Sequence, residues 1–81
     1  MIYQQIIKGH EVYAAAPEIM RPDIGTSNFV GGQYLAIFSV DNPPATAGGQ
    51  CVKDGTGKNR LFTVPIDAIT AAFVAAEALI P

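Results

Sequence analysis

The chain has 81 residues, of which 5 are basic and 7 are acidic, so its formal net charge is −2. Only 15% of the residues are charged, against about 25% in an ordinary soluble domain, so the chain is apolar for its size. The length predicts a single domain over residues 1–81, and the slight acidic excess argues against a nucleic-acid partner.

Two strands are predicted at the start of the chain. Met1–Ile7 is rich in β-branched and aromatic residues, which favours a strand, although a short helix is the alternative. Lys8 and Gly9 interrupt the run, and His10–Ala16 resumes it. We expect a hairpin with Gly9 at a positive φ in the turn. Pro17 is expected to end the second strand, because it has no N–H to donate.

The next segment, Glu18–Gly32, is predicted to be an irregular connection. It contains Pro22 and the turn-forming cluster Gly25–Asn28. Loops of this length are uncommon in compact domains and are often ordered against a partner. Five apolar side chains in this segment are therefore expected to pack on the core or on a neighbouring subunit: Ile19, Met20, Ile24, Phe29 and Val30.

A central strand is predicted over Gln33–Val40, because both of its faces are largely apolar. Asp41 and the prolines that follow it end this strand. A second hairpin is predicted from Gln50–Lys53 and Arg60–Val64. Its turn is rich in glycine and charged residues, so we expect it to point to solvent.

The tip of this second hairpin, KDGTGKNR, is the one stretch with the glycines and lysine of a phosphate-binding loop. A P-loop reads G-x-x-x-x-G-K-[ST], and its hydroxyl residue binds magnesium. Here Asn59 follows Lys58, the spacer is absent and no helix begins directly after the loop. A solvent-exposed hairpin tip is the better interpretation.

A helix is predicted over Pro65–Leu79, with Pro65 in the first turn, where a missing N–H costs nothing. Its apolar residues form two stripes. The first is predicted to cover the sheet: Ile66, Ile69, Phe73, Ala76 and Ile80. The second is predicted to meet another subunit: Ala68, Ala72, Ala75 and Leu79. The alternative is that these alanines simply favour a helix and tolerate exposure.

The sequence offers little for catalysis or metal binding. One cysteine, Cys51, cannot form an internal disulfide, and with the single His10 it cannot build a four-ligand zinc site. Cys51 is interpreted as a small buried residue and His10 as a solvated one, so no catalytic, cofactor or metal residues are predicted. The apolar run between Asp67 and Glu77 is too short to span a membrane, and no signal peptide is visible. We therefore expect a protein of the cytoplasm, or of a particle assembled there.

The expected fold class is α+β: a small antiparallel sheet of about four strands in two hairpins, with one C-terminal helix packed on it. A chain this short, without a disulfide or a metal, commonly depends on oligomerisation. The resulting hypothesis is a non-enzymatic structural or accessory subunit of a larger assembly, such as a decoration or cement protein of a phage particle. Its partner would be a second copy of the chain or a protein scaffold.

Two alternatives remain open at this stage. A small dimeric ligand-binding domain, encoded on a mobile element, would use aromatic side chains to line an apolar pocket: Tyr3, Tyr13, Phe29, Tyr34 and Phe38. An enzyme would need His10, Cys51 or a carboxylate in a cleft, with a shifted pKa.

Overall fold

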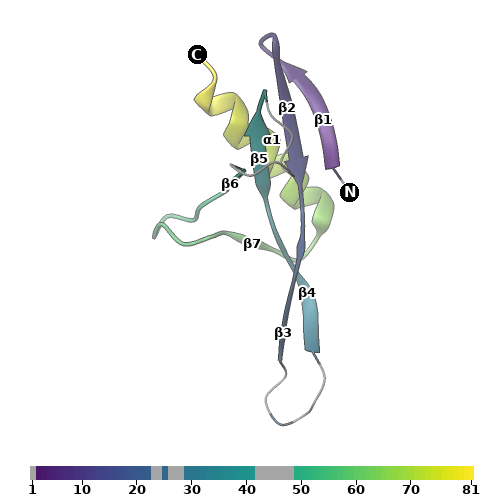
Figure 1. Cartoon of the computed structure of the whole chain (residues 1–81). Coiled ribbons are helices and arrows are strands. Elements are labelled where there is room, and N and C mark those ends of the chain that lie inside the picture. The colour runs from purple at the N-terminus through teal and green to yellow at the C-terminus, as the bar shows by residue number, and fades with distance from the viewer. Residues whose placement is uncertain (1, 23–24, 26–28, 42–48) are drawn as a thin grey trace.

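Seven antiparallel strands and one helix make up the described residues, 2–22, 25, 29–41 and 49–81, of the computed structural model (Figure 1). The elements are β1 (Ile2–Ile7), β2 (His10–Ala15), β3 (Glu18–Pro22), β4 (Phe29–Leu35), β5 (Ile37–Val40), β6 (Gln50–Cys51), β7 (Leu61–Phe62) and α1 (Pro65–Leu79). A four-stranded sheet has the order β1-β2-β5-β6, and a three-stranded sheet has the order β3-β4-β7. The predicted α+β class with a C-terminal helix is confirmed.

The β1–β2 hairpin closes through a two-residue turn. Ile7 faces His10 in the register, and Lys8 and Gly9 between them have φ values of 51° and 84°. Positive φ at both central residues is characteristic of a type I′ turn, whose twist matches that of the strands. The prediction for Gly9 is confirmed, and Lys8 shares the conformation. The Lys8 ammonium also donates to the Ile80 carbonyl oxygen (3.0 Å), which ties the turn to the end of α1.

The two sheets are joined by one continuous antiparallel ribbon, in which β2 leads into β3 and β4 leads into β5. Ala15 faces Ile37 in the larger sheet, and Glu18 faces Tyr34 in the smaller one. Three steps along one strand therefore match three steps along the other, so the register is unchanged across the boundary. The β3–β4 end of this ribbon, here called the arm, projects away from α1 and gives the molecule a long axis of 49 Å (Figure 1).

The sheets divide where Pro17 faces Leu35. The Leu35 N–H donates to the Pro17 carbonyl oxygen (3.0 Å), but Pro17 has no N–H with which to return the bond. Pro17 thus ends β2 as predicted, yet pairing resumes at once in β3. The irregular connection predicted for Glu18–Gly32 is wrong, because it contains β3 and the start of β4. The single strand predicted for Gln33–Val40 is interrupted at the fully buried Ala36.

The second hairpin is present at its tip, but its two arms enter different sheets. Lys53 and Asn59 form an antiparallel bridge, and the Arg60 N–H donates to the Val52 carbonyl oxygen (2.9 Å). Beyond the tip, β6 pairs with β5 and β7 pairs with β4. Residues 53–60 are all exposed, as predicted for a solvated tip.

The core lies between α1 and the face of the larger sheet that it covers, mainly β2 and β5. The predicted helix bounds are confirmed, but the predicted division of its faces is not. Ile69, Ala76 and Ile80 of the first stripe are buried as predicted, but Ile66 is 57% exposed. Ala68 and Ala72 of the second stripe are fully buried as well. The face packed on the sheet therefore combines residues of both stripes, and its alanines let the helix approach the sheet closely. The buried hydrophobic residues are Val12, Ala14, Ala36, Phe38, Phe62, Ala68, Ile69, Ala72, Ala76 and Ile80.

Candidate functional site

The outer edge of β1 presents unpaired backbone groups. In an antiparallel ladder, a residue directs its N–H and C=O to one neighbouring strand, and successive residues alternate between sides. The Asp41 N–H donates to the Glu11 carbonyl oxygen (2.6 Å), so Glu11 faces β5 and the next residue of β2 faces β1. The register of β1 on β2 then leaves three residues of β1 directed outward, where no strand of the described ranges pairs with them: Ile2, Gln4 and Ile6.

This edge lacks the features that protect the other long edge of the protein. Charged residues, proline and β-bulges all discourage pairing with another chain. The outer strand of the smaller sheet, β3, carries two charges and a proline, which are Glu18, Arg21 and Pro22, and its register shifts between Ile19 and Arg21, where two residues of β4 face one residue of β3. By contrast, β1 reads IYQQII, with no charge, proline or glycine, and its pairing with β2 is regular. The β1 edge is thus a regular, uncharged edge that is open to strand addition.

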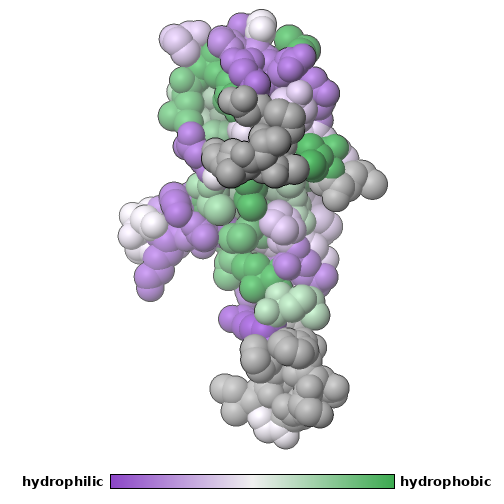
Figure 2. Space-filling model, in the orientation of Figure 1, coloured by the Kyte–Doolittle hydropathy of each residue, from purple (hydrophilic) through white to green (hydrophobic). Residues whose placement is uncertain are grey.

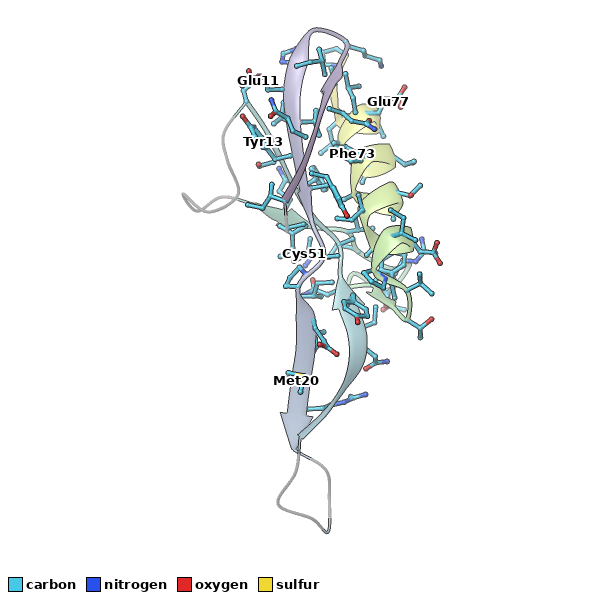
Figure 3. All side chains as sticks on the ribbon, turned by 90° about the vertical axis from the view of Figure 1, so that its right-hand side faces the viewer. Glu11, Tyr13, Met20, Cys51, Phe73 and Glu77 are labelled. Carbon is cyan, nitrogen blue, oxygen red and sulfur yellow. The ribbon has the colours of Figure 1, made fainter. Side chains whose placement is uncertain are left out.

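The side chains of β1 add apolar surface on both sides of this edge. Ile2 and Ile6, on the face turned away from α1, are 49% and 65% exposed. On the helix side, shallow grooves of about 450, 350 and 200 Å³ run between β1 and α1. Tyr3 and Gln5 line them from the strand and Phe73 from the helix, and Figure 3 shows Phe73 on the side of α1 next to β1. Both faces of the strand are therefore accessible to a partner.

A cluster of polar side chains ends the ladder between β2 and β5. His10 Nδ1 lies 2.8 Å from Asp41 Oδ2, and Asp41 Oδ1 accepts the Glu11 N–H (3.1 Å). Asp41 has a φ of 63°, so its carboxylate takes the place of a ladder carbonyl. The hydrogen bond from His10 holds the pKa of Asp41 below its usual value. The sequence could not pair these residues, because they are 31 positions apart.

Tyr13 extends this cluster along β2. Its hydroxyl donates to Glu11 Oε2 (3.2 Å), and Figure 3 shows the two residues near one another on the same strand. Partial desolvation, and then the hydrogen bond to Glu11, raise the pKa of Tyr13. His10 and Asp41 are 44% and 53% exposed, so the cluster lies on the open surface and not in a cleft. The hydrogen bonds of this cluster therefore serve to end the pairing of β2 with β5.

The glycine-rich tip is organised by Asp54. Its Oδ1 accepts the Thr56 N–H (2.8 Å), the Thr56 hydroxyl (2.6 Å) and the Lys58 N–H (3.2 Å), while the Gly57 N–H donates to the Asp54 carbonyl oxygen (3.2 Å). The bonds from Thr56 are the main cause of a lowered pKa at Asp54. The N–H groups of Thr56, Gly57 and Lys58 are thus already bonded to Asp54 within the tip. Cys51, the one cysteine of the sequence, lies away from this tip: it is half-buried in β6, opposite Ile37.

The predicted helical interface is only partly available. Ala68 and Ala72 are fully buried in the core of their own chain, so they cannot contact a partner. Ala75 is half-buried, and Leu79 is 60% exposed. The helix instead presents Val74, which is 63% exposed and was not among the predicted interface residues. The face available to a partner is therefore rotated from the predicted stripe.

The predicted interface residues near the arm are placed as follows. Ile19 is half-buried in β3, and Met20 beside it is 55% exposed (Figure 3). Phe29 and Val30 lie in β4, although their side chains, like the whole of Ile24, lie outside the described residues. Figure 2 shows apolar surface running from the upper body towards the arm.

The aromatic residues predicted to line one pocket do not converge. Phe38 is buried in the core, whereas Tyr13 lies on the opposite face of the same sheet, as the register of β2 on β5 requires. Tyr3 lies beside α1, and Tyr34 is in β4 of the smaller sheet. An apolar ligand could therefore meet Tyr3 and Phe73, but not the predicted set.

Two further searches bear on function. Within the described ranges, no helix is long and apolar enough to cross a membrane. The same residues contain no group of three or more histidine, cysteine, aspartate or glutamate side chains placed to hold a metal ion. No protein-family model, curated protein or solved structure gives a significant match to this chain.

Proposed function

We propose that this protein is a non-enzymatic structural or accessory subunit that enters a larger assembly by strand addition at β1. The observation that carries the proposal is the regular, uncharged edge of β1, which contrasts with the charged, proline-containing edge of β3. Strand addition gives affinity through main-chain hydrogen bonds and specificity through alternate side chains. Both are offered by the outward backbone groups and the exposed isoleucines of this strand.

The surface composition supports the same proposal. A chain of 81 residues buries only about 60–65% of its unfolded surface, and assembly is a common way to bury more. Nine large apolar side chains are exposed among the described residues: Ile2, Tyr3, Ile6, Met20, Leu61, Val64, Ile66, Val74 and Leu79. We place the subunit in the cytoplasm or in a particle assembled there, with decoration of a phage particle as its specific form.

The test is the native mass of the purified protein, measured by light scattering over a dilution series. Wild-type protein is expected to exceed the mass of one chain. Ile6→Lys puts a charge on the open edge, so it is expected to shift the assembly towards the monomer at every concentration. Met20→Lys, a comparably exposed position on the arm, is the matched control and is expected to leave the mass unchanged.

Two results would contradict the proposal. The first is a wild-type protein that remains monomeric at all concentrations, because the proposed assembly begins with pairing between copies of the chain. The second is an assembly that dissociates with Met20→Lys and not with Ile6→Lys, because the arm would then be the interface. Far-UV circular dichroism of both variants checks that the fold is retained.

A second candidate function, a dimeric ligand-binding domain, is favoured by the grooves between β1 and α1. Tyr3 and Phe73 would contact an apolar ligand there. The apolar dye ANS, added to the folded protein, distinguishes this candidate. Saturable binding that is weakened by Phe73→Ala supports it, and the absence of saturable binding refutes it.

A further inference from the structure

We infer that the strand added at β1 is β1 of a second copy, antiparallel, with Gln4 of one copy facing Gln4 of the other. This inference rests on the proposed function and specifies the partner of the same edge. It follows from three properties of the strand: which backbone groups point outward, the symmetry of its side chains and the position of α1.

The outward backbone groups determine the register. Hydrogen-bonded pairs across an antiparallel edge can form only between residues whose groups point outward, which here are Ile2, Gln4 and Ile6. With Gln4 opposite itself, Ile2 of each copy faces Ile6 of the other, and every outward N–H and C=O on both strands is paired. If one copy of β1 were shifted by one residue along the other, the outward N–H and C=O groups would face residues whose own groups are already bonded to β2. A shift by two would leave an end residue unpaired or would bring in Lys8, which lies in the turn.

The side chains suit pairing with a copy of the same strand. On the face away from α1 the order Ile2, Gln4, Ile6 is symmetric about its centre, so isoleucines of the two copies flank a central pair of glutamines. Cross-strand pairs of β-branched residues stabilise a sheet, and like charges directly opposite destabilise it. Because β1 carries no charge, pairing with its own copy brings no like charges together.

The helix does not obstruct this pairing. α1 packs mainly over β2 and β5, and its main contacts do not include β1. In the paired sheet, four strand spacings of about 4.8 Å separate the two helices, which gives roughly 19 Å between their axes. Packed helices need only about 8–10 Å. The pairing also consumes the open edge, and the opposite edge strand, β6, has only two residues, so growth stops at two copies.

Disulfide trapping tests the register directly. Gln4→Cys is made in a Cys51→Ser background and oxidised gently, with Gln5→Cys as the matched control on the same exposed strand. In the inferred register the two Cα atoms at position 4 lie about 5.5 Å apart, within the disulfide range. The two Cα atoms at position 5 lie roughly 8 Å apart, beyond that range. We expect a covalent dimer from Gln4→Cys, reversed by reductant, and a monomer from Gln5→Cys on a non-reducing gel.

The outcomes separate the inference from the proposed function. If neither cysteine variant is trapped while Ile6→Lys still dissociates the assembly, the partner is not β1 in this register, and only the inference is overturned. If both variants are trapped equally, the strands pair in parallel or slide, which also overturns it. If the wild-type protein is monomeric, both the inference and the proposed function fail.

Discussion

The position of Ala72 provides the sharpest test of how α1 packs on the sheet. Ala72 lies in the middle of the helix and is fully buried in the core that contains Val12 and Phe38. Ala72→Leu adds three carbon atoms at a site with no exposed area. We expect it to destabilise the fold, because a well-packed core can accept this volume only by shifting the helix or forcing strained rotamers.

The magnitude follows from the size of the chain. Overpacking a core typically costs about 1–3 kcal/mol. A chain of 81 residues has a free energy of unfolding of roughly 4–12 kcal/mol, so the cost is a large part of the total. For a domain of this size, each kcal/mol lowers Tm by about 4–8 °C. The expected decrease in Tm is therefore about 4–24 °C.

Thermal unfolding followed by far-UV circular dichroism measures this decrease. Ala78→Leu is the matched control, because Ala78 is exposed on the same helix and leucine is nearly as good a helix former. Its Tm is expected to stay close to that of the wild type. Equal Tm values for the two variants, or a change in native mass without a change in Tm for Ala72→Leu, would refute the packing described here.

Two further predictions concern the turn and the strand end. Gly9→Ala places a side chain at a φ of 84° and is expected to cost about 1–2 kcal/mol, seen as a lower Tm; Gly55→Ala, where φ is not positive, is the control and should be nearly neutral. Because the pKa of Asp41 is lowered in the folded state, its contribution to stability is full above the pKa of an unfolded aspartate and is lost as pH falls through the lowered value. Asp41→Asn should remove this part of the acid dependence of Tm, and an unchanged pH profile would contradict the assignment.

Local sequence signals were sufficient for the elements that depend on neighbouring residues. The helix bounds follow from Pro65 and an uninterrupted run of helix formers, and the first turn follows from Gly9. The arm was missed because its strands contain proline and two adjacent glycines, which usually mark loops. The pairing that makes them strands is set by the register of β2 on β5, and this register is not visible locally.

The candidate site on β1 also combines properties that are visible in the local sequence with one that depends on long-range pairing. The alternation of β1 was readable in the sequence, and so was the lack of charge along it. Which of the strands would lie at an open edge depends on the order β1-β2-β5-β6, which no local pattern contains. The faces of α1 were misassigned for a related reason. With alanine on several sides, the helix has little contrast between faces, so its orientation depends on which side chains are small enough to meet the sheet.

The unbroken register of the long ribbon limits where the length of this chain can vary. From Glu11 to Ile19 every residue is matched by one residue of the opposite strand, across both sheets. Inserting or deleting one residue there would turn all following side chains to the other face. The bulge between Ile19 and Arg21 already absorbs a mismatch, so changes in length are tolerated beyond it. Related chains should therefore differ in the reach of the arm while keeping the body at constant length.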